Sequence, residues 1–164
     1  MKQITQRYPK TVYLILLNIR SVLNVGSIFR TADAAGVSKI FLVGYTPSPK
    51  DRFGNERADL AKVALGAEKN VAWESLPQIL PLIKKLKKEN FQIIALEQDK
   101  RAVDYKKIKT KNKIAIILGN ETSGISKNVL KNCDLVGEIS MLGKKESLNV
   151  AVSTGIFLFR VLGI

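Results

Sequence analysis

Short apolar runs recur along the chain and predict the strands of a sheet. Several runs are apolar at almost every position, which is typical of strands buried on both faces of a parallel sheet. Segments with a helical spacing of apolar residues lie between them. This alternation predicts an α/β fold, a mostly parallel sheet flanked by helices, in one domain spanning residues 1–164. The predicted strands are 11–18, 38–44, 91–96, 113–118 and 134–139, with a weaker one at 70–74.

The first predicted helix spans residues 24–36, with Asn24 as the N-cap and Gly36 just beyond the C-terminal end. Its apolar residues follow the i, i+3, i+4, i+7 repeat, beginning at Val25. Arg30 falls well away from this stripe, so it should point outward or into a cleft.

Two more helices are predicted further along the chain. One spans 75–89, and Pro81 marks an alternative start because proline fits only the first turn of a helix. The last spans 147–161, with Ser147 as the N-cap, and is apolar nearly all round. Such a helix is buried on most sides, either by the core or by a second subunit.

The net charge of the chain adds information about a binding partner. The chain has 27 Lys and Arg against 14 Asp and Glu, which gives a net charge of +13. An excess of this size suggests an anionic partner, most simply nucleic acid, although solubility alone is an alternative explanation. The polar segments 45–57 and 97–112 read as loops and are candidates for phosphate contacts.

Missing residue types exclude several kinds of chemistry. The chain has no histidine, so Ser-His-Asp and Cys-His catalysis are excluded. With Cys133 as the only cysteine, the common zinc sites and an intrachain disulfide are excluded too, and no metal is expected. No apolar run approaches the ~18 residues of a membrane span, and the N-terminus has no signal-peptide pattern, so a cytoplasmic protein is predicted.

The stretch KIAIILGNETSGIS, residues 113–126, combines a strand, a glycine-containing loop and a possible helix start near Ser126. This order is typical of phosphate-binding sites. However, Ile125 stands where a P-loop has lysine, and Glu121 would repel a triphosphate. A carboxylate with free backbone amides instead suits a ligand that carries hydroxyls, an amine or a sulfonium. An ordinary strand-to-helix turn remains an equal alternative.

Two other stretches, Asn24-Val25-Gly26 with Arg30 and GKKESLNVAVSTG at 143–155, are weak signals by themselves. In combination, three blocks resemble the SpoU/TrmH-type RNA 2′-O-ribose methyltransferases of the SPOUT superfamily. The third block is the most specific, and the resemblance covers nearly the whole chain. The blocks are NIRSVLNVGSIFRTADAAGVSKIFLVG (18–44), IAIILGNETSGIS (114–126) and EISMLGKKESLNVAVSTGIFLFR (138–160).

The resemblance implies a C-terminal deep trefoil knot, a homodimer, and S-adenosylmethionine as the donor of a methyl group to a ribose 2′-hydroxyl of tRNA or rRNA. It implies that Arg30 is catalytic and reaches the site across the dimer interface, and that Asn24, Glu121, Ser147 and Asn149 complete the polar set. The chain departs from the family at Ser140, where proline is frequent. The implied donor-binding residues are Leu96, Leu118, Gly119, Asn120, Glu121, Ile139, Met141, Leu148 and Asn149.

The chain shows no RNA-binding extension at either end, so its substrate should be selected by the core surface. The basic residues expected to contact RNA are Arg30, Arg52, Lys100, Arg101, Lys106 and Lys107. Two other functions stay open. One is a non-catalytic RNA-binding protein that retains the SPOUT fold. The other is a nucleotide-dependent enzyme that uses the 119–124 loop, which the missing lysine disfavours.

Overall fold

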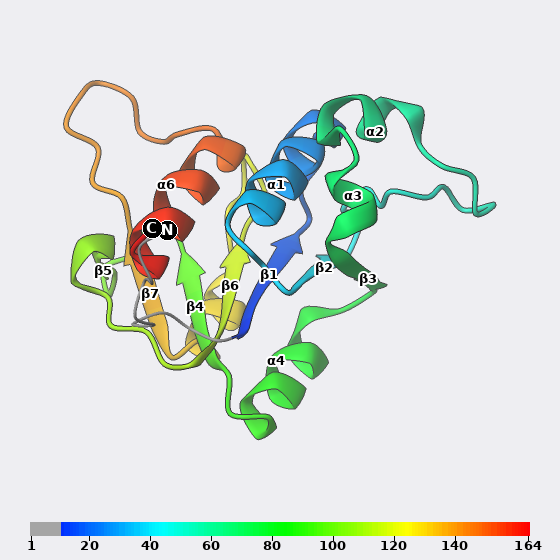
Figure 1. Ribbon diagram of the computed structural model, residues 1–164. Coiled ribbons are helices and arrows are strands. Elements are labelled where there is room, and N and C mark those ends of the chain that lie inside the picture. The colour runs from blue at the N-terminus through cyan, green and yellow to red at the C-terminus, as the bar shows by residue number, and fades with distance from the viewer. Residues whose placement is uncertain (1–10) are drawn as a thin grey trace, which may run out of the picture.

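A computed structural model describes residues 11–164 of the chain. Its seven strands form one sheet in the order β3-β2-β1-β6-β4-β7-β5, and every neighbouring pair is parallel, which confirms the predicted α/β class (Figure 1). The elements are β1 (Thr11–Leu17), α1 (Val22–Ala34), β2 (Lys39–Val43), α2 (Ala58–Ala64), α3 (Ala67–Asn70), β3 (Ala72–Leu76), α4 (Ile79–Lys88), β4 (Gln92–Leu96), β5 (Val103–Asp104), the 3₁₀ turn η1 (Tyr105–Lys107), β6 (Lys113–Leu118), α5 (Lys127–Lys131), β7 (Leu135–Glu138) and α6 (Val150–Leu162).

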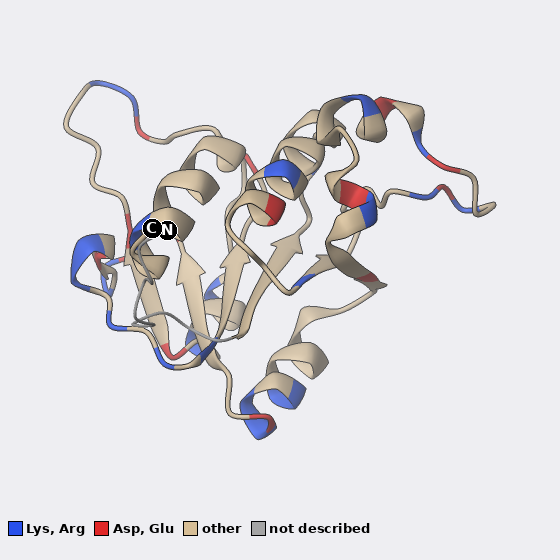
Figure 2. Ribbon diagram, in the orientation of Figure 1, with Lys and Arg blue, Asp and Glu red and all other residues tan. Residues whose placement is uncertain are grey.

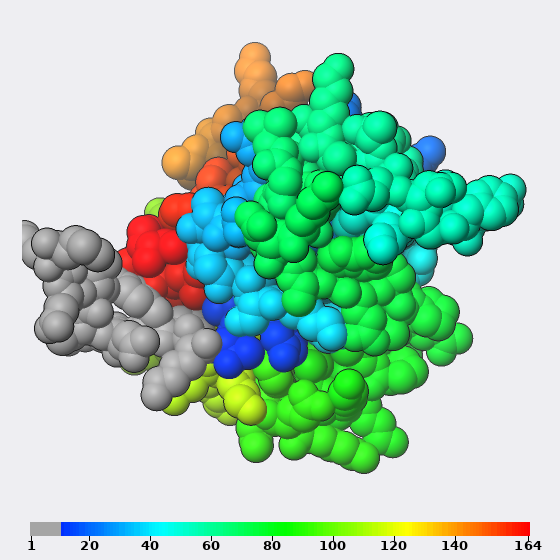
Figure 3. Space-filling model, turned by 45° about the vertical axis from the view of Figure 1, so that its right-hand side comes forward, coloured from blue at the N-terminus to red at the C-terminus, as the bar shows by residue number. Residues whose placement is uncertain are grey.

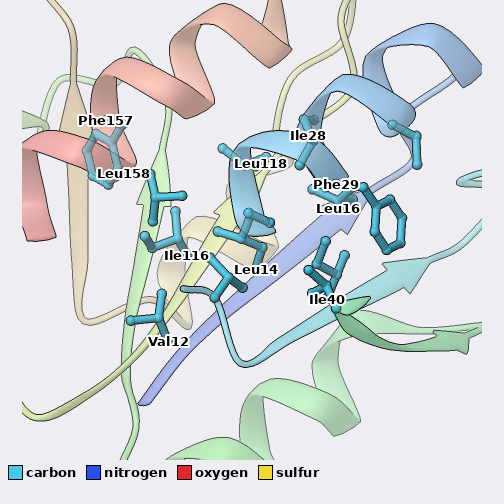
Figure 4. Close-up of a cluster of buried hydrophobic side chains, with 14 of the residues drawn as sticks. Val12, Leu14, Leu16, Ile28, Phe29, Ile40, Ile116, Leu118, Phe157 and Leu158 are labelled. Carbon is cyan, nitrogen blue, oxygen red and sulfur yellow. The ribbon is translucent and has the colours of Figure 1, made fainter. Parts of the chain in front are cut away.

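Alternate residues of the central strands serve two separate cores. Because successive side chains of a strand point to opposite faces, Leu14 and Leu16 of β1 join the cluster beneath α1 and α6 (Figure 4). Ile15 lies between them in sequence and joins the cluster beneath α4 and α5. This two-sided burial explains why the strand segments are apolar at nearly every position.

Helices α1 and α6 lie side by side on one face of the sheet (Figure 1). A Cβ atom on Gly155 would lie 3.7 Å from Thr31 Cγ2, so the two helices approach closely there. Helix α1 follows β1 and helix α6 follows β7, so both helices begin at the carboxyl edge of the sheet.

Both predicted helix caps on this side were wrong. Ser21, not Asn24, is the N-cap of α1, and its hydroxyl accepts a hydrogen bond from the Asn24 amide. Asn149, not Ser147, is the N-cap of α6, because its Oδ1 accepts from the amides at the start of the helix. The prediction for the other end of α1 was right, since Gly36 follows the C-cap with φ = 71°.

Other boundaries differ because strand and helix compete for the same residues. Strand β3 extends to Leu76, so α4 begins at Ile79 rather than at residue 75, and Pro81 lies in its first turn. The predicted loop 97–112 contains β5 and η1, and the short helices α2 and α3 were not predicted. Within residues 11–164, no helix is long and apolar enough to cross a membrane. The trefoil knot and the single-domain extent stay predictions.

Candidate functional site

A cavity of about 500 Å³ opens at the carboxyl edge of the sheet, where β4, β6 and β7 end. Ligands of parallel α/β sheets usually bind at this edge, because the loops that follow neighbouring strands meet there. Eight of the nine residues that the family resemblance implies for binding the methyl donor line this one cavity, and Ser147 lines it too. The eight are Leu96, Leu118, Gly119, Asn120, Glu121, Ile139, Met141 and Leu148.

Sequence reasoning missed part of the lining. Glu97, Gln98 and Asp99 directly follow the predicted strand 91–96, and their place at the end of a strand was the signal that could have found them. Gln98 also ties the cavity to the loop before α6, because its side-chain amide donates to the Glu146 carbonyl at 2.6 Å. Other missed lining residues are Thr122, Ser123, Gly124, Ile125, Lys127, Leu130, Glu146, Val150 and Ser153.

The buried side chain of Asn120 holds the loop after β6 in shape. Its Oδ1 accepts from the amides of Thr122 (2.9 Å) and Ser123 (2.8 Å). Its Nδ2 donates to the Asn18 carbonyl and to the Tyr45 hydroxyl, at 2.9 and 3.0 Å. Both ends of the amide are thus used, and the loop is fixed before any ligand binds.

Two glycines let this loop fold tightly against β4. A Cβ on Gly119 would lie 2.7 Å from the backbone carbon of Gly124. Gly124 has φ = 63°, and a Cβ there would collide with the Glu97 carboxylate. That carboxylate in turn accepts from the Ile125 amide at 2.8 Å. Larger residues at either glycine would displace the wall of the cavity.

Glu121 turns its carboxylate toward the start of α1. It accepts hydrogen bonds from the Arg20 amide (3.0 Å), the Ser21 amide (3.1 Å) and Asn24 Nδ2 (3.0 Å). Partial burial raises the pKa of Glu121, but these hydrogen bonds outweigh it, so the pKa lies below its ordinary value. An anion at this place is also favoured by the helix dipole of α1.

Asn24 and Asn149 extend this contact to α6. Asn149 Nδ2 donates to Asn24 Oδ1 at 3.0 Å, while its own Oδ1 caps the helix. Three residues of the predicted polar set, Asn24, Glu121 and Asn149, therefore form one hydrogen-bonded chain although they come from distant parts of the sequence. Of the residues expected to bind the methyl donor, Asn149 is the one that does not line the cavity.

Arg30 lies apart from this cavity. Its side chain is exposed on α1 and does not line the cavity of its own chain. Within residues 11–164 it makes no hydrogen bond or ion pair. Its arrival from a second copy of the chain therefore stays a prediction.

The other basic residues expected to contact RNA are exposed on two segments that lie apart (Figure 2). Lys100, Arg101, Lys106 and Lys107 belong to residues 97–113, which carry seven Lys and Arg and three Asp and Glu. Arg52 lies on an arm, residues 45–57, that projects from the body of the molecule (Figure 3). The Arg52 guanidinium lies 4.7 Å from the Phe53 ring.

Cys133 carries no chemistry in this structure. It is half-buried, and its thiol donates to the Val129 carbonyl at 3.4 Å. Burial raises the pKa of Cys133 to about 11, so the thiol stays protonated and is a poor nucleophile near neutral pH. No group of three or more His, Cys, Asp or Glu that could hold a metal ion exists among residues 11–164.

Comparisons with known proteins give one consistent result. Residues 11–159 match the model of the SpoU rRNA Methylase family. The chain is 36% identical over 151 residues to the 23S rRNA (guanosine-2'-O-)-methyltransferase RlmB of Blochmanniella floridana, covering 91% of this chain and 56% of that protein. It therefore spans less than two thirds of the length of this relative.

Two solved structures share the fold. One is the AdoMet-bound rRNA methyltransferase from Sinorhizobium meliloti, with a TM-score of 0.82 and 27% identity over 93% of this chain and 56% of that one. The other is the A. aeolicus TrmH/SpoU tRNA modifying enzyme, with a TM-score of 0.82 and 25% identity over 96% of this chain and 77% of that one. The similarity thus covers more than nine tenths of this chain.

Proposed function

The chain belongs to the SpoU rRNA Methylase family, and we propose that it transfers a methyl group from S-adenosylmethionine to a ribose 2′-hydroxyl of RNA. One observation carries the proposal. Eight of the nine residues that the family resemblance implies for donor binding line a single cavity at the carboxyl edge of the sheet. A relative named as an rRNA guanosine-2'-O-methyltransferase and a neighbour that holds AdoMet support the same reaction.

The charges around the cavity suit a cationic donor. Four acidic residues line it, Glu97, Asp99, Glu121 and Glu146, against Lys127 as the only basic residue among those described. This is the reverse of the balance of the whole chain, which is +13. A triphosphate would be repelled here, whereas S-adenosylmethionine, which when bound supplies its methyl group from a positively charged sulfonium, would not.

The size and the apolar floor also fit an adenosyl group. A volume of about 500 Å³ lies within the usual range for small-molecule sites. Leu118 and Val150 are buried in the floor, and Ile139 is half-buried beside them. Leu96 and Leu118 would offer apolar contacts to the donor, while Gly119 and Gly124 allow the loop to pack closely enough to form the wall of the cavity.

Methyl transfer also needs the 2′-hydroxyl to be oriented and to lose its proton. A guanidinium is a poor general base because it holds its proton strongly, so a base role for Arg30 would need help from another group, for example an RNA phosphate. Orienting the ribose and stabilising the developing negative charge is the alternative role for Arg30. Ser147 lines the cavity and would contact the substrate in either role.

We also propose that Arg30 reaches the cavity of a partner copy in a homodimer. The apolar side chains of Val152, Ile156 and Phe159 recur along one side of α6 and are 52%, 38% and 38% exposed. Their spacing of four and three residues gives a continuous stripe, which in a monomer would remain in water. Leu23 on the neighbouring helix α1 is 62% exposed and would extend the same surface.

Donor binding separates this proposal from its two alternatives. Calorimetric titration should show that S-adenosylmethionine binds and that ATP does not. Binding of ATP in place of S-adenosylmethionine would favour a nucleotide-dependent enzyme. Absence of donor binding, with RNA binding intact, would favour a non-catalytic RNA-binding protein. Transfer of a labelled methyl group to unmodified tRNA or rRNA then identifies which RNA is the substrate.

A further inference from the structure

A second cavity, of about 420 Å³, opens at the same edge of the sheet. Its walls come from the ends of β1 and β2, the first turn of α4 and the loop before α5. It shares Ser123 and Gly124 with the first cavity, so one stretch of backbone separates the two. None of the residues that the family resemblance implies for donor binding, catalysis or RNA binding lines it.

The chemistry of this second cavity differs from that of the rest of the surface. No Lys, Arg, Asp or Glu lines it, in a chain with a net charge of +13. Leu17, Val43 and Ile79 are buried in its floor. A phosphate or a carboxylate group would find no counter-ion here, so the cavity favours an uncharged ligand with an apolar face.

Two amide side chains at this cavity have unused hydrogen-bonding groups. The side-chain amide of Gln78 makes no hydrogen bond with any other residue of the described range, 11–164. Asn18 Oδ1 accepts from the Tyr45 amide at 3.4 Å, while its Nδ2 has no partner among the same residues. Asn and Gln side chains are well matched to the edges of nucleobases, since each offers a donor and an acceptor side by side.

We propose that the second cavity receives one unpaired base of the RNA substrate, from a nucleotide adjacent to the one that is methylated. The proposal rests on the RNA methyltransferase function proposed above. Proteins that read RNA sequence bind bases that are splayed out of single-stranded loops, through their faces and their hydrogen-bonding edges. The apolar floor would contact the face of such a base, and Gln78 and Asn18 would read its edge. The shared Ser123–Gly124 wall places this base beside the donor cavity.

Binding of free nucleosides tests the cavity without any methyl transfer. Saturation-transfer NMR would use adenosine, guanosine, cytidine and uridine, with S-adenosylmethionine present in excess so that the donor cavity is filled. At least one nucleoside should still bind. Leu80 lines the rim and is 39% exposed, so Leu80→Trp should fill the opening and abolish that signal. Lys84→Trp, one turn further along α4 and outside the cavity, is the matched control and should retain it.

RNA kinetics test the link to the substrate. Leu80→Trp should raise KM for RNA by roughly tenfold, the loss expected when one base contact is removed, while the donor Kd stays unchanged. Gln78→Ala should alter the preference among substrates that differ at one nucleotide beside the methylated position. No nucleoside binding in the presence of donor, or binding that survives Leu80→Trp, would overturn the proposal. Nucleoside binding without any methyl transfer would instead count against the proposed reaction and leave the base site standing.

Discussion

Replacing Glu121 with alanine removes the acceptor of three hydrogen bonds whose donors lie about 100 residues earlier in the chain. Hydrogen bonds to an ionised group contribute about 1.5–3 kcal/mol each where water is excluded. Glu121 is exposed, however, so solvent competes and each contributes roughly 0.3–0.7 kcal/mol. We therefore expect Glu121→Ala to lower the free energy of unfolding by about 1–2 kcal/mol at pH 7.

The penalty should depend on pH in a defined direction. The pKa of Glu121 is lower in the folded chain than its ordinary value of 4.5. Its ionised form therefore stabilises the fold fully above that ordinary value, and the stabilisation is lost as the pH falls through the lower folded pKa. The difference between wild type and Glu121→Ala should be constant from pH 7 down to about pH 5 and should shrink below it.

Urea denaturation at pH 7 and at a series of lower pH values measures this difference, provided that the m-value is unchanged. A double-mutant cycle with Asn24→Ala isolates the side-chain contact, and the coupling free energy should be about 0.3–0.7 kcal/mol, the share of one hydrogen bond. Gln98→Ala, which breaks a contact on the other side of the same cavity, is a control that should not couple to Asn24→Ala. The assigned role of the carboxylate would be refuted if Glu121→Ala lowered the free energy of unfolding equally at pH 7 and at pH values well below the pKa of Glu121. It would also be refuted if Glu121→Ala and Asn24→Ala showed no coupling.

Four further predictions concern the reaction and the assembly. Arg30→Ala should lower methyl transfer about 100-fold without changing the donor Kd in calorimetry, and full transfer would exclude both roles assigned to Arg30. Gly124→Ala places a side chain in the left-handed region and against Glu97. It should lower the free energy of unfolding, measured in urea, by about 1–3 kcal/mol and should weaken binding of the methyl donor. Unchanged donor binding would contradict the role of Gly124 in the cavity wall. Ile156→Asp should convert the proposed dimer to monomers in sedimentation velocity, whereas a monomeric wild type would contradict the proposed interface. If six phosphates of duplex RNA are neutralised, the log–log plot of the affinity against salt should have a slope of about −5, and a flat plot would mean that the +13 charge is not a binding surface.

The sequence was most informative where burial decides the residue type. The strands β1, β4 and β6 fall within two residues of their predicted ends, because both faces of each strand are buried and nearly every position is apolar. Helices were harder to place. The runs 58–64 and 67–70 are too short to show a periodic pattern, and α4 could not be separated from β3 by its apolar residues alone.

The candidate site was recovered from motif order rather than from local physics. Nothing in the local sequence around Glu121 shows that its carboxylate contacts the start of α1, since the partner amides are about 100 residues away. The same holds for Asn149, whose partner Asn24 is 125 residues distant. Long-range convergence of this kind follows from strand order, which no single segment encodes. The second cavity was missed for the same reason, because its walls come from four separate parts of the chain.

The most direct test of the central claim is methyl transfer to RNA. The purified protein would be incubated with S-adenosylmethionine labelled in its methyl group and with unmodified tRNA in one reaction and ribosomal RNA in another. Alkali-resistant linkages in each RNA would then be mapped. We predict one labelled 2′-O-methylated position in one of the two RNA pools, and loss of the label with Arg30→Ala. Label on a base instead of a ribose, or no label in either pool from a protein that does not bind the donor, would contradict the proposed function.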